Sequence, residues 1–234
     1  MQYKAVFFDL DGTLLPLDQD HFVKVYFKAL SAKMAQIGCD PKEFLGALMK
    51  GIDAMRVNDG SCTNEERFRE EYYGFYKGKE ELHERTLENF YENEFQEIRS
   101  VTGCDPAAAE IVASLKAKGI PMVIATNPVF PPYATQSRVR WAGLDTEDFE
   151  IITTYDNVSF CKPNTDYYMN LCERIGVAPE DCVMVGNDVD DDMVAETIGM
   201  KVFLLTDNLV NRENKDITVY NRGSFAEQKE LLGV

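Results

Sequence analysis

Five short runs of apolar, β-branched and aromatic residues constrain the fold of this chain. They are Tyr3–Phe8, Met122–Ala125, Phe149–Thr153, Cys182–Val185 and Lys201–Leu205. Helical patterns separate the runs in the second half of the chain, and continuous apolar runs of this length are typical of strands that are buried on both faces. The sequence therefore predicts an α/β fold with a Rossmann-like, doubly wound parallel sheet as its core.

Five segments of the chain have the pattern of helices that would cover this sheet. They are Ala107–Lys118, Pro132–Trp141, Asn164–Ile175, Asp190–Ile198 and Ser224–Leu232. The first consists of good helix formers, ends before Gly119 and is followed by Pro121, which is a typical helix stop. Strands that alternate with helices in this way favour parallel pairing.

Residues 18–98 contain none of these apolar runs. Their pattern is that of several amphipathic helices separated by turn residues. If the first run joins the later ones in one sheet, this stretch is an insertion that leaves the sheet after its first strand and returns near Gly103. We therefore expect a discontinuous α/β core of residues 1–15 and 100–234 and an all-helical cap of residues 16–99, with two connections that permit hinge motion.

The chain is acidic, with 24 Lys and Arg residues, 40 Asp and Glu residues and a formal net charge of -16. Such a surface repels nucleic acid and anionic membrane faces, so neither is an expected partner. No stretch approaches the ~18 apolar residues of a membrane span, and acids at positions 9 and 11 interrupt any apolar signal region. The six cysteines form no C-x-x-C pair, which favours reduced core thiols in a cytoplasmic protein. The oligomeric state stays open.

Polar residues follow two of the predicted strands. Asp9 and Asp11 come directly after the first apolar run, and Gly12 permits an abrupt backbone turn behind them. Thr126 and Asn127 follow the second run and offer a hydroxyl and an amide that can hydrogen-bond phosphate oxygens. Because ligands bind beyond the carboxyl ends of parallel strands, we expect these residues in one site. There, one acid can act as a nucleophile and the other as a proton donor.

Two later segments add charge to the same edge of the predicted sheet. Lys162-Pro163 precedes the helical pattern that begins near Asn164, so the lysine can project over the strand ends as a point positive charge. The acidic run Gly186-Asn187-Asp188-Val189-Asp190-Asp191-Asp192 follows the fourth apolar run. Carboxylates that are clustered so closely, next to another carboxylate, are costly unless a hard cation lies between them.

These motifs, in this order, resemble those of the haloacid dehalogenase (HAD) superfamily of hydrolases. They are Asp-x-Asp-Gly-Thr at 9–13, the threonine at 126, Lys-Pro at 162–163 and Gly-Asn-Asp-x-x-x-Asp at 186–192. The resemblance spans nearly the whole chain, since the helical insertion lies where some subfamilies carry a cap after the first motif. It implies a Mg²⁺-dependent phosphatase that hydrolyses a phosphomonoester, a small soluble phosphorylated metabolite, through an aspartyl-phosphate.

The resemblance also assigns roles to the individual residues. Asp9 is implied as the nucleophile, and Asp11 as the acid that protonates the leaving alcohol and the base that then activates water. Thr126 and the amide of Asn127 would bind the phosphoryl oxygens. Lys162 would offset negative charge on the nucleophile and in the transition state.

A Mg²⁺ ion is the cofactor that the resemblance implies. Its ligands would be the carboxylate of Asp9, the backbone carbonyl of Asp11 and Asp188, with Asp192 acting directly or through a water. Octahedral coordination by oxygen ligands, with some waters retained, suits this ion.

The last motif departs from the pattern of many relatives, which have Gly-Asp where this chain has Gly-Asn-Asp. Asp188 and Asp192 preserve the Asp-x-x-x-Asp spacing, but Asp190 and Asp191 leave the choice of ligand open. Acids are also favoured in the first turn of a helix by the macrodipole. We expect both metal binding and helix capping to occur, with Asp188 and Asp192 on the metal and Asp190 and Asp191 facing solvent.

Two alternative functions fit the same motifs. A phosphomutase of the β-phosphoglucomutase type shares them together with a helical cap, but returns the phosphoryl group to the sugar. A non-catalytic HAD-fold binding protein would keep the fold as a scaffold. Loss of a motif residue would favour that second alternative, and no motif residue is lost.

Three other features have no assigned catalytic role. His21 and His83, in the expected cap, are interpreted as ordinary surface or packing residues. The aromatic group Tyr72, Tyr73, Phe75 and Tyr76 has helical spacing, which favours core packing over pocket lining. Residues 127–132 contain three prolines, and they either shape the pocket floor or only end the strand before them.

Overall fold

The computed structural model describes residues 3–233, and its core is a six-stranded parallel sheet in the order β3-β2-β1-β4-β5-β6. The strands are β1 (Ala5–Phe8), β2 (Met122–Ile124), β3 (Ile151–Ile152), β4 (Cys182–Gly186), β5 (Lys201–Leu205) and β6 (Arg222–Gly223). The five apolar runs supply β1 to β5, which confirms the predicted α/β class. β6 was not predicted, because it is a two-residue strand without an apolar run.

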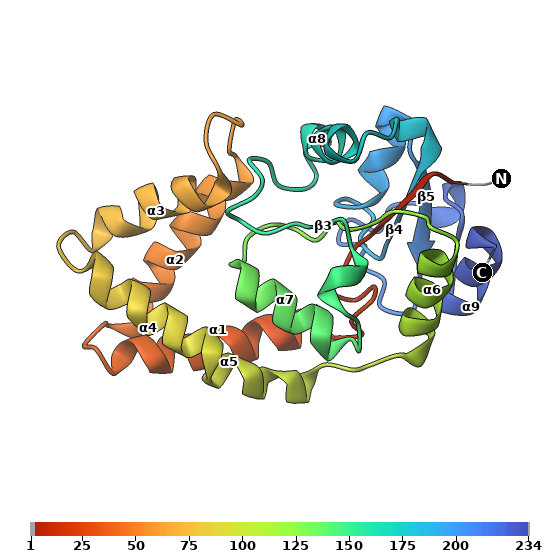
Figure 1. Cartoon of the computed structure of the whole chain (residues 1–234). Helices are drawn as coiled ribbons and strands as arrows, with labels where there is room; N and C mark the ends of the chain where they lie inside the picture. The colour runs from red at the N-terminus through yellow and green to blue at the C-terminus, as the bar shows by residue number, and fades with distance from the viewer. Residues whose placement is uncertain (1–2, 234) are drawn as a thin grey trace.

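Helices cover both faces of this sheet. They are α6 (Pro106–Ala117), α7 (Pro132–Trp141), α8 (Thr165–Ile175) and α9 (Phe225–Leu232). Val6 and Phe8 of β1 belong to the hydrophobic cluster that contains residues of α6, α7 and α9, whereas Ala5 and Phe7 pack in the cluster with α8. Successive side chains of a strand point to opposite faces, so the sheet is buried on both sides. Figure 1 shows α6 and α9 beside the sheet and α8 above it.

The helix predicted over Asp190–Ile198 was wrong in its first residues. Only Met193–Ile198 is helical, as the 3₁₀ helix η4. Before it, the carboxylate of Asp188 accepts hydrogen bonds from the backbone N–H groups of Asp190 (2.9 Å) and Asp191 (3.1 Å). These bonds hold a turn where an α-helix would otherwise begin, since a short acidic side chain competes for backbone donors.

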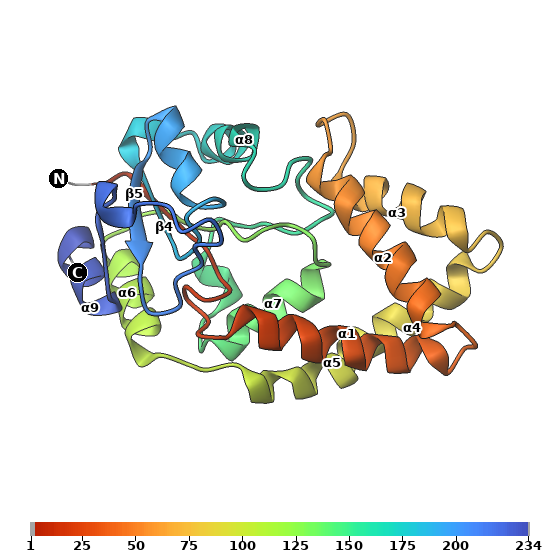
Figure 2. The ribbon, with the colours of Figure 1, turned by 180° about the vertical axis from the view of Figure 1, so that it is seen from behind.

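Five helices between β1 and α6 form the helical cap. They are α1 (Gln19–Ala35), α2 (Pro41–Arg56), α3 (Asn64–Phe75), α4 (Glu80–Glu92) and the short α5 (Glu94–Glu97). Asp18, Asp40 and Thr63 begin the first three by accepting hydrogen bonds from backbone N–H groups in the first turn. Figures 1 and 2 show the cap on one side of the sheet and both chain ends on the other. The domain boundaries at 15/16 and 99/100 stay a prediction.

The two connections between sheet and cap lie side by side. Leu17 and Thr102 form an antiparallel bridge, and the N–H of Gly103 donates to the carbonyl of Pro16 over 2.6 Å. A second contact lies at the start of α3, where the N–H of Asn64 donates to Val158 O over 3.0 Å. A third joins Gln96 Nε2 to the Ser137 hydroxyl of α7 over 3.1 Å, so the cap is hydrogen-bonded to the core at several separate places.

The aromatic group of the cap mostly packs inside it. Tyr72 is fully buried, and its hydroxyl bonds the ring Nδ1 of His83 at 2.9 Å. Tyr73 and Tyr76 are half-buried, and their rings lie 5.2 Å from that of Tyr72. The prediction of core packing is confirmed for these three, whereas Phe75 is exposed.

All six cysteines are free thiols. Cys161, Cys172 and Cys182 are buried, but Cys104 is exposed and therefore not a core thiol. Among the helices of residues 3–233, none has the length and apolar character that a membrane span requires.

Candidate active site

The predicted site residues meet beyond the carboxyl ends of β1, β2 and β4. Asp9 directly follows β1, Thr126 lies two residues after β2, and Asp188 lies two residues after β4. These residues line one cavity of about 280 Å³. The seven predicted residues that contact it are Asp9, Asp11, Thr126, Asn127, Lys162, Asp188 and Asp192. The topology thus brings together side chains that lie far apart in the sequence.

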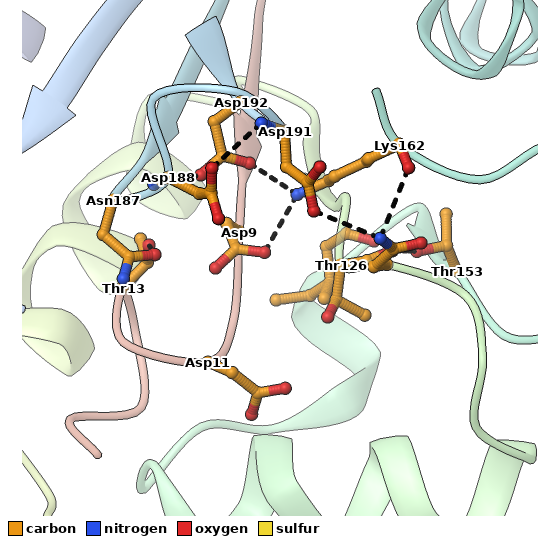
Figure 3. A network of polar contacts seen from close by, with 12 residues as sticks. Asp9, Asp11, Thr13, Thr126, Thr153, Lys162, Asn187, Asp188, Asp191 and Asp192 are labelled. Carbon is orange, nitrogen blue, oxygen red and sulfur yellow. Dashed lines mark hydrogen bonds and ion pairs between the residues drawn. The ribbon is translucent and has the colours of Figure 1, made fainter. Parts of the chain in front are cut away.

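Lys162 is at the centre of the site (Figure 3). Its Nζ donates to Asp9 Oδ1 over 2.9 Å and to Asp192 Oδ1 over 2.6 Å, and only 1% of its side chain is exposed. Burial works against the charged ammonium group, but the two carboxylates outweigh it and hold the pKa of Lys162 well above its usual value. Lys162 is therefore a fixed positive charge on one oxygen of Asp9.

The loop after β1 turns sharply so that Asp9 and Asp11 both reach the cavity. Gly12 has φ +87°, in the left-handed region, and a Cβ there would collide with the side chain of Asn187. The Thr13 hydroxyl donates to Asn187 Oδ1 over 3.1 Å, which ties this loop to the loop after β4. Asn187 therefore holds two site loops together.

Asp11 is paired with an arginine that the sequence analysis did not identify. Nη1 of Arg138, in α7, donates to Asp11 Oδ2, and the Arg138 side chain is fully buried. Burial raises the pKa of Asp11 even though the charge of Arg138 works in the opposite direction. Asp11 Oδ1 is buried and has no hydrogen-bond partner among the described residues. No sequence signal separates Arg138 from Arg140 of the same helix, which is exposed.

The loop after β4 fixes Asp188 on both sides. Its N–H donates to Asp192 Oδ2 over 2.9 Å, and its own Oδ2 accepts from Arg212 Nη1 over 2.6 Å. More than half of the Arg212 side chain is exposed, so this arginine reaches in from the surface. Arg212 is the second site residue that the sequence analysis missed, since it lies outside every motif.

Asp191 faces the cavity, so the expectation that it points to solvent was wrong. Its Oδ2 accepts from Asn127 Nδ2 over 3.2 Å, and burial raises its pKa. The reason is the turn before η4, which directs Asp191 inward where a helix would place it outside. Asp190 pairs with Lys215, outside the cavity lining.

Thr126 and Asn127 form the part of the cavity wall that adjoins the acidic loop. The backbone carbonyl of Thr126 accepts hydrogen bonds from the Thr153 hydroxyl (2.7 Å) and the Tyr167 hydroxyl (2.9 Å), which fix its backbone. Val129 and Phe130, further along the same segment, also line the cavity. Of the two interpretations of residues 127–132, the structure therefore supports the one in which they shape the pocket.

The donor set of the site fits a Mg²⁺ ion. In residues 3–233, no three acidic, histidine or cysteine side chains converge as a complete metal cage. Both oxygens of Asp192 are already hydrogen-bonded, whereas Asp9 Oδ1 accepts only from Lys162 among the described residues and keeps a lone pair for a metal. Asp9, Asp188, Asp191 and Asp192 outnumber Lys162 and Arg212, the cations that pair with them, so a divalent ion would relieve their repulsion. Two carboxylates, a backbone carbonyl and waters are a normal ligand set for Mg²⁺.

Comparison with known proteins identifies the family. A model of the haloacid dehalogenase-like hydrolases matches residues 3–199. The chain belongs to this family. A glyceraldehyde 3-phosphate phosphatase of Methanothermobacter thermautotrophicus is 27% identical over 98% of this chain and 99% of its own length.

Two solved structures share the fold of this HAD-like hydrolase. A HAD phosphatase from Thermococcus onnurineus has a TM-score of 0.61 at 21% identity and covers 100% of this chain and 98% of its own. YfnB of Bacillus subtilis, which was solved bound to magnesium, has a TM-score of 0.59 at 19% identity and covers both chains fully. These likenesses extend over cap and core together, so the helical cap is part of the shared fold.

Proposed function

We propose that this HAD-like hydrolase is a magnesium-dependent phosphatase that cleaves phosphomonoesters through an aspartyl-phosphate on Asp9. The observation that carries the proposal is the state of the Asp9 carboxylate. One of its oxygens is held by Lys162 at 2.9 Å, and the other accepts no hydrogen bond from the described residues and is free to attack. The relative with glyceraldehyde 3-phosphate phosphatase activity in its name supports the reaction class.

In the first step, Asp9 Oδ2 forms a bond to phosphorus while the bond from phosphorus to the ester oxygen breaks. Protonated Asp11 gives its proton to the departing alkoxide, for which the unpartnered Oδ1 is available. In the second step, Asp11 takes a proton from a water that attacks phosphorus, and inorganic phosphate leaves Asp9. Two displacements replace one difficult hydrolysis.

Charge stabilisation comes from both sides of the transferred group. Lys162 offsets negative charge on Asp9, while the Thr126 hydroxyl and the N–H of Asn127 donate to phosphoryl oxygens. When bound, Mg²⁺ would screen the phosphoryl charge from the carboxylates. Asp9, the carbonyl of Asp11 and Asp188 would hold the ion.

Asp192 has a different role in this proposal from the one that the family resemblance implies. Its oxygens accept from Lys162 Nζ and from the N–H of Asp188, and it is fully buried. We assign it to positioning: it holds Lys162 against Asp9 and Asp188 toward the ion. A ligand that is anchored by such a partner needs no rearrangement when the metal binds.

The cap of residues 16–99 would open and close over this site about the paired segments at Leu17 and Thr102. Free thiols favour a cytoplasmic location for the enzyme.

Hydrolysis of p-nitrophenyl phosphate with and without Mg²⁺ tests the proposal. The wild type should release phosphate only with the ion, Asp9→Asn should be inactive, and Asp20→Asn, at an exposed position of α1, should match the wild type. Asp11→Asn, quenched in acid, should carry one phosphoryl group by mass spectrometry, because the second step is slowed. Activity in Asp9→Asn would refute the proposal. Isomerised sugar phosphate in excess of free phosphate would favour a phosphomutase instead.

A further inference from the structure

The cavity does not end at the acidic residues but continues into the cap, where its walls change in character. The extension is lined by Val23 and Phe27 of α1, Met49 and Ile52 of α2, Leu87 of α4, and Phe130 of the segment after β2. Each of these side chains is half-buried, so each has surface to offer a bound molecule. The part of the cavity that would surround the leaving group is therefore predominantly apolar.

The polar groups of this extension are fewer than the apolar ones, but the amide of Gln19 and the hydroxyls of Tyr133 and Tyr155 make no hydrogen bond to other described residues. The hydroxyls of Tyr26 and Tyr91 bond each other at 2.7 Å, so they satisfy one another. Arg56 and Arg212 also line the cavity, but the side chains of both are more than half exposed. Within the described residues, no carboxylate lines the extension beyond those of the catalytic end.

Such walls discriminate between leaving groups. A sugar, glycerol or hydroxy-acid group would exchange its hydrogen bonds to water for contacts with mostly apolar side chains, which can replace only some of them. An aromatic or alkyl group would instead leave water for apolar surface, which is favourable roughly in proportion to the area buried. The aromatic rings of Phe27 and Phe130 add faces against which another ring can pack.

We infer that the natural substrate is a phosphomonoester of a predominantly apolar alcohol, with an aryl or alkyl leaving group that fills the extension between α1, α2 and α4. This inference rests on the proposed phosphatase activity and names the substrate class of the same site. It separates the enzyme from its relative named for glyceraldehyde 3-phosphate, whose leaving group is short and polar.

The wild-type enzyme provides the first test. With Mg²⁺ present, kcat/KM is measured for 2-phenylethyl phosphate and n-hexyl phosphate, and for glyceraldehyde 3-phosphate, glycerol phosphate and phosphoglycolate. All five release a primary alcohol, so differences in kcat/KM report recognition more than leaving-group chemistry. We expect the two apolar esters to be preferred by about a hundredfold, since each apolar group of the right size is worth roughly tenfold or more.

The outcomes distinguish a failure of the phosphatase proposal from a failure of the inference about the substrate. A protein that hydrolyses none of these esters and no p-nitrophenyl phosphate would refute the phosphatase proposal and this inference with it. A protein that hydrolyses p-nitrophenyl phosphate but prefers the polar esters would refute this inference alone.

A matched pair of variants tests the walls. Met49→Gln places an amide of nearly the same shape in the extension, whereas Met169→Gln makes the same change at an exposed position of α8, outside the cavity. Met49→Gln should lower kcat/KM for 2-phenylethyl phosphate by about tenfold, and its effect on methyl phosphate should be small. Met169→Gln should leave both unchanged. If the ratio of kcat/KM for 2-phenylethyl phosphate to kcat/KM for methyl phosphate were unchanged in Met49→Gln, the extension would not hold the leaving group.

Discussion

The guanidinium group of Arg138 lies against the carboxylate of Asp11, the residue proposed to handle the proton of the leaving group. Its Nη1 donates to Asp11 Oδ2, its Nη2 donates to the Thr135 hydroxyl over 3.2 Å, and its Cζ lies 4.3 Å from the centre of the Phe130 ring. Three contacts on a fully buried side chain leave it one orientation. Arg138 therefore determines where the Asp11 carboxylate points and which of its oxygens stays free.

Replacement of Arg138 should impair proton transfer selectively. In Arg138→Met, Asp11 loses its anchor, so kcat/KM for an alkyl phosphate should fall by about 100-fold, within the range for general acid catalysis. For p-nitrophenyl phosphate the fall should be about tenfold or less, because its leaving group departs without a proton. Arg140→Met, at an exposed position of the same helix, is the control. Equal losses for the two substrates would mean that Arg138 has only a structural role.

The metal ligands can be assigned by a comparison of two neighbouring acids. Asp188→Asn should raise the Mg²⁺ concentration for half-maximal activity by at least about tenfold, since it removes a charged ligand. Asp190→Asn should leave it unchanged, because Asp190 pairs with Lys215 outside the cavity. Activity is titrated with Mg²⁺ after removal of metal by a chelator. If the effects were reversed, Asp190 would be the ligand.

Most of the fold was predictable, because a strand that is buried on both faces consists of a continuous apolar run that the sequence shows directly. The runs at Met122–Ala125 and Cys182–Val185 became β2 and β4, and the polar residues after them met at one edge. β6 left no such trace: it consists of Arg222 and Gly223, and its place beside β5 depends on backbone hydrogen bonds such as Thr206 N to Gly223 O at 3.0 Å.

The parts of the site that were not predictable depend on contacts over long sequence separations. Arg138 meets Asp11 across 127 residues, and Arg212 meets Asp188 across 24. Neither arginine lies in a motif: packing brings the buried Arg138 to its carboxylate, and the course of the chain after β5 brings the exposed Arg212 to its own. The inward position of Asp191 depends on the turn made by Asp188, which competes with the helix that composition favours.

Lys162 is expected to matter for stability as well as for activity. Removal of one partner of a buried ion pair leaves uncompensated charge, so Lys162→Met should lower the free energy of unfolding by about 3 kcal/mol in the absence of metal. Its kcat/KM should fall by about 100-fold or more, as for loss of a transition-state donor. Lys215→Met, at an exposed ion pair, should change neither. Urea denaturation and p-nitrophenyl phosphate assays measure both effects. Full activity in Lys162→Met would contradict the assigned role.

Two glycines of the cap that share a backbone conformation allow the contribution of the cap–core contact to stability to be measured separately. Gly60 and Gly78 have φ +87° and +80°, but a Cβ at Gly60 would collide with the ring of Phe160 in the core, whereas a Cβ at Gly78 would meet open space. Both alanine variants should lose about 1 kcal/mol of unfolding free energy from the left-handed backbone. Gly60→Ala should lose more, and its KM should rise because the cap docks less well. If urea denaturation gave equal losses of unfolding free energy for the two variants, the ring of Phe160 would be able to move aside without destabilising the protein.

The stability of the protein should depend on the protonation of His83. The His83 ring is buried between the Tyr72 hydroxyl, 2.9 Å from Nδ1, and the Cys39 thiol, 3.5 Å from Nε2. Burial, aided by the charge of Lys79, lowers the pKa of His83, so the folded state keeps the ring neutral.

The unfolded chain binds a proton on His83 near its ordinary pKa of about 6.5, whereas the folded chain does so only at lower pH. The stabilisation is therefore complete above about pH 6.5 and declines as the pH falls toward the folded pKa, by up to about 1.4 kcal/mol per pH unit. His83→Gln should be less stable at pH 7 but should lose less on acidification, as measured by urea denaturation between pH 7 and pH 5. His21→Gln, at an exposed position of the same cap, should keep the wild-type dependence of the unfolding free energy on pH. If His83→Gln kept that pH dependence too, the loss of stability in acid would have to come from the carboxylates of the protein.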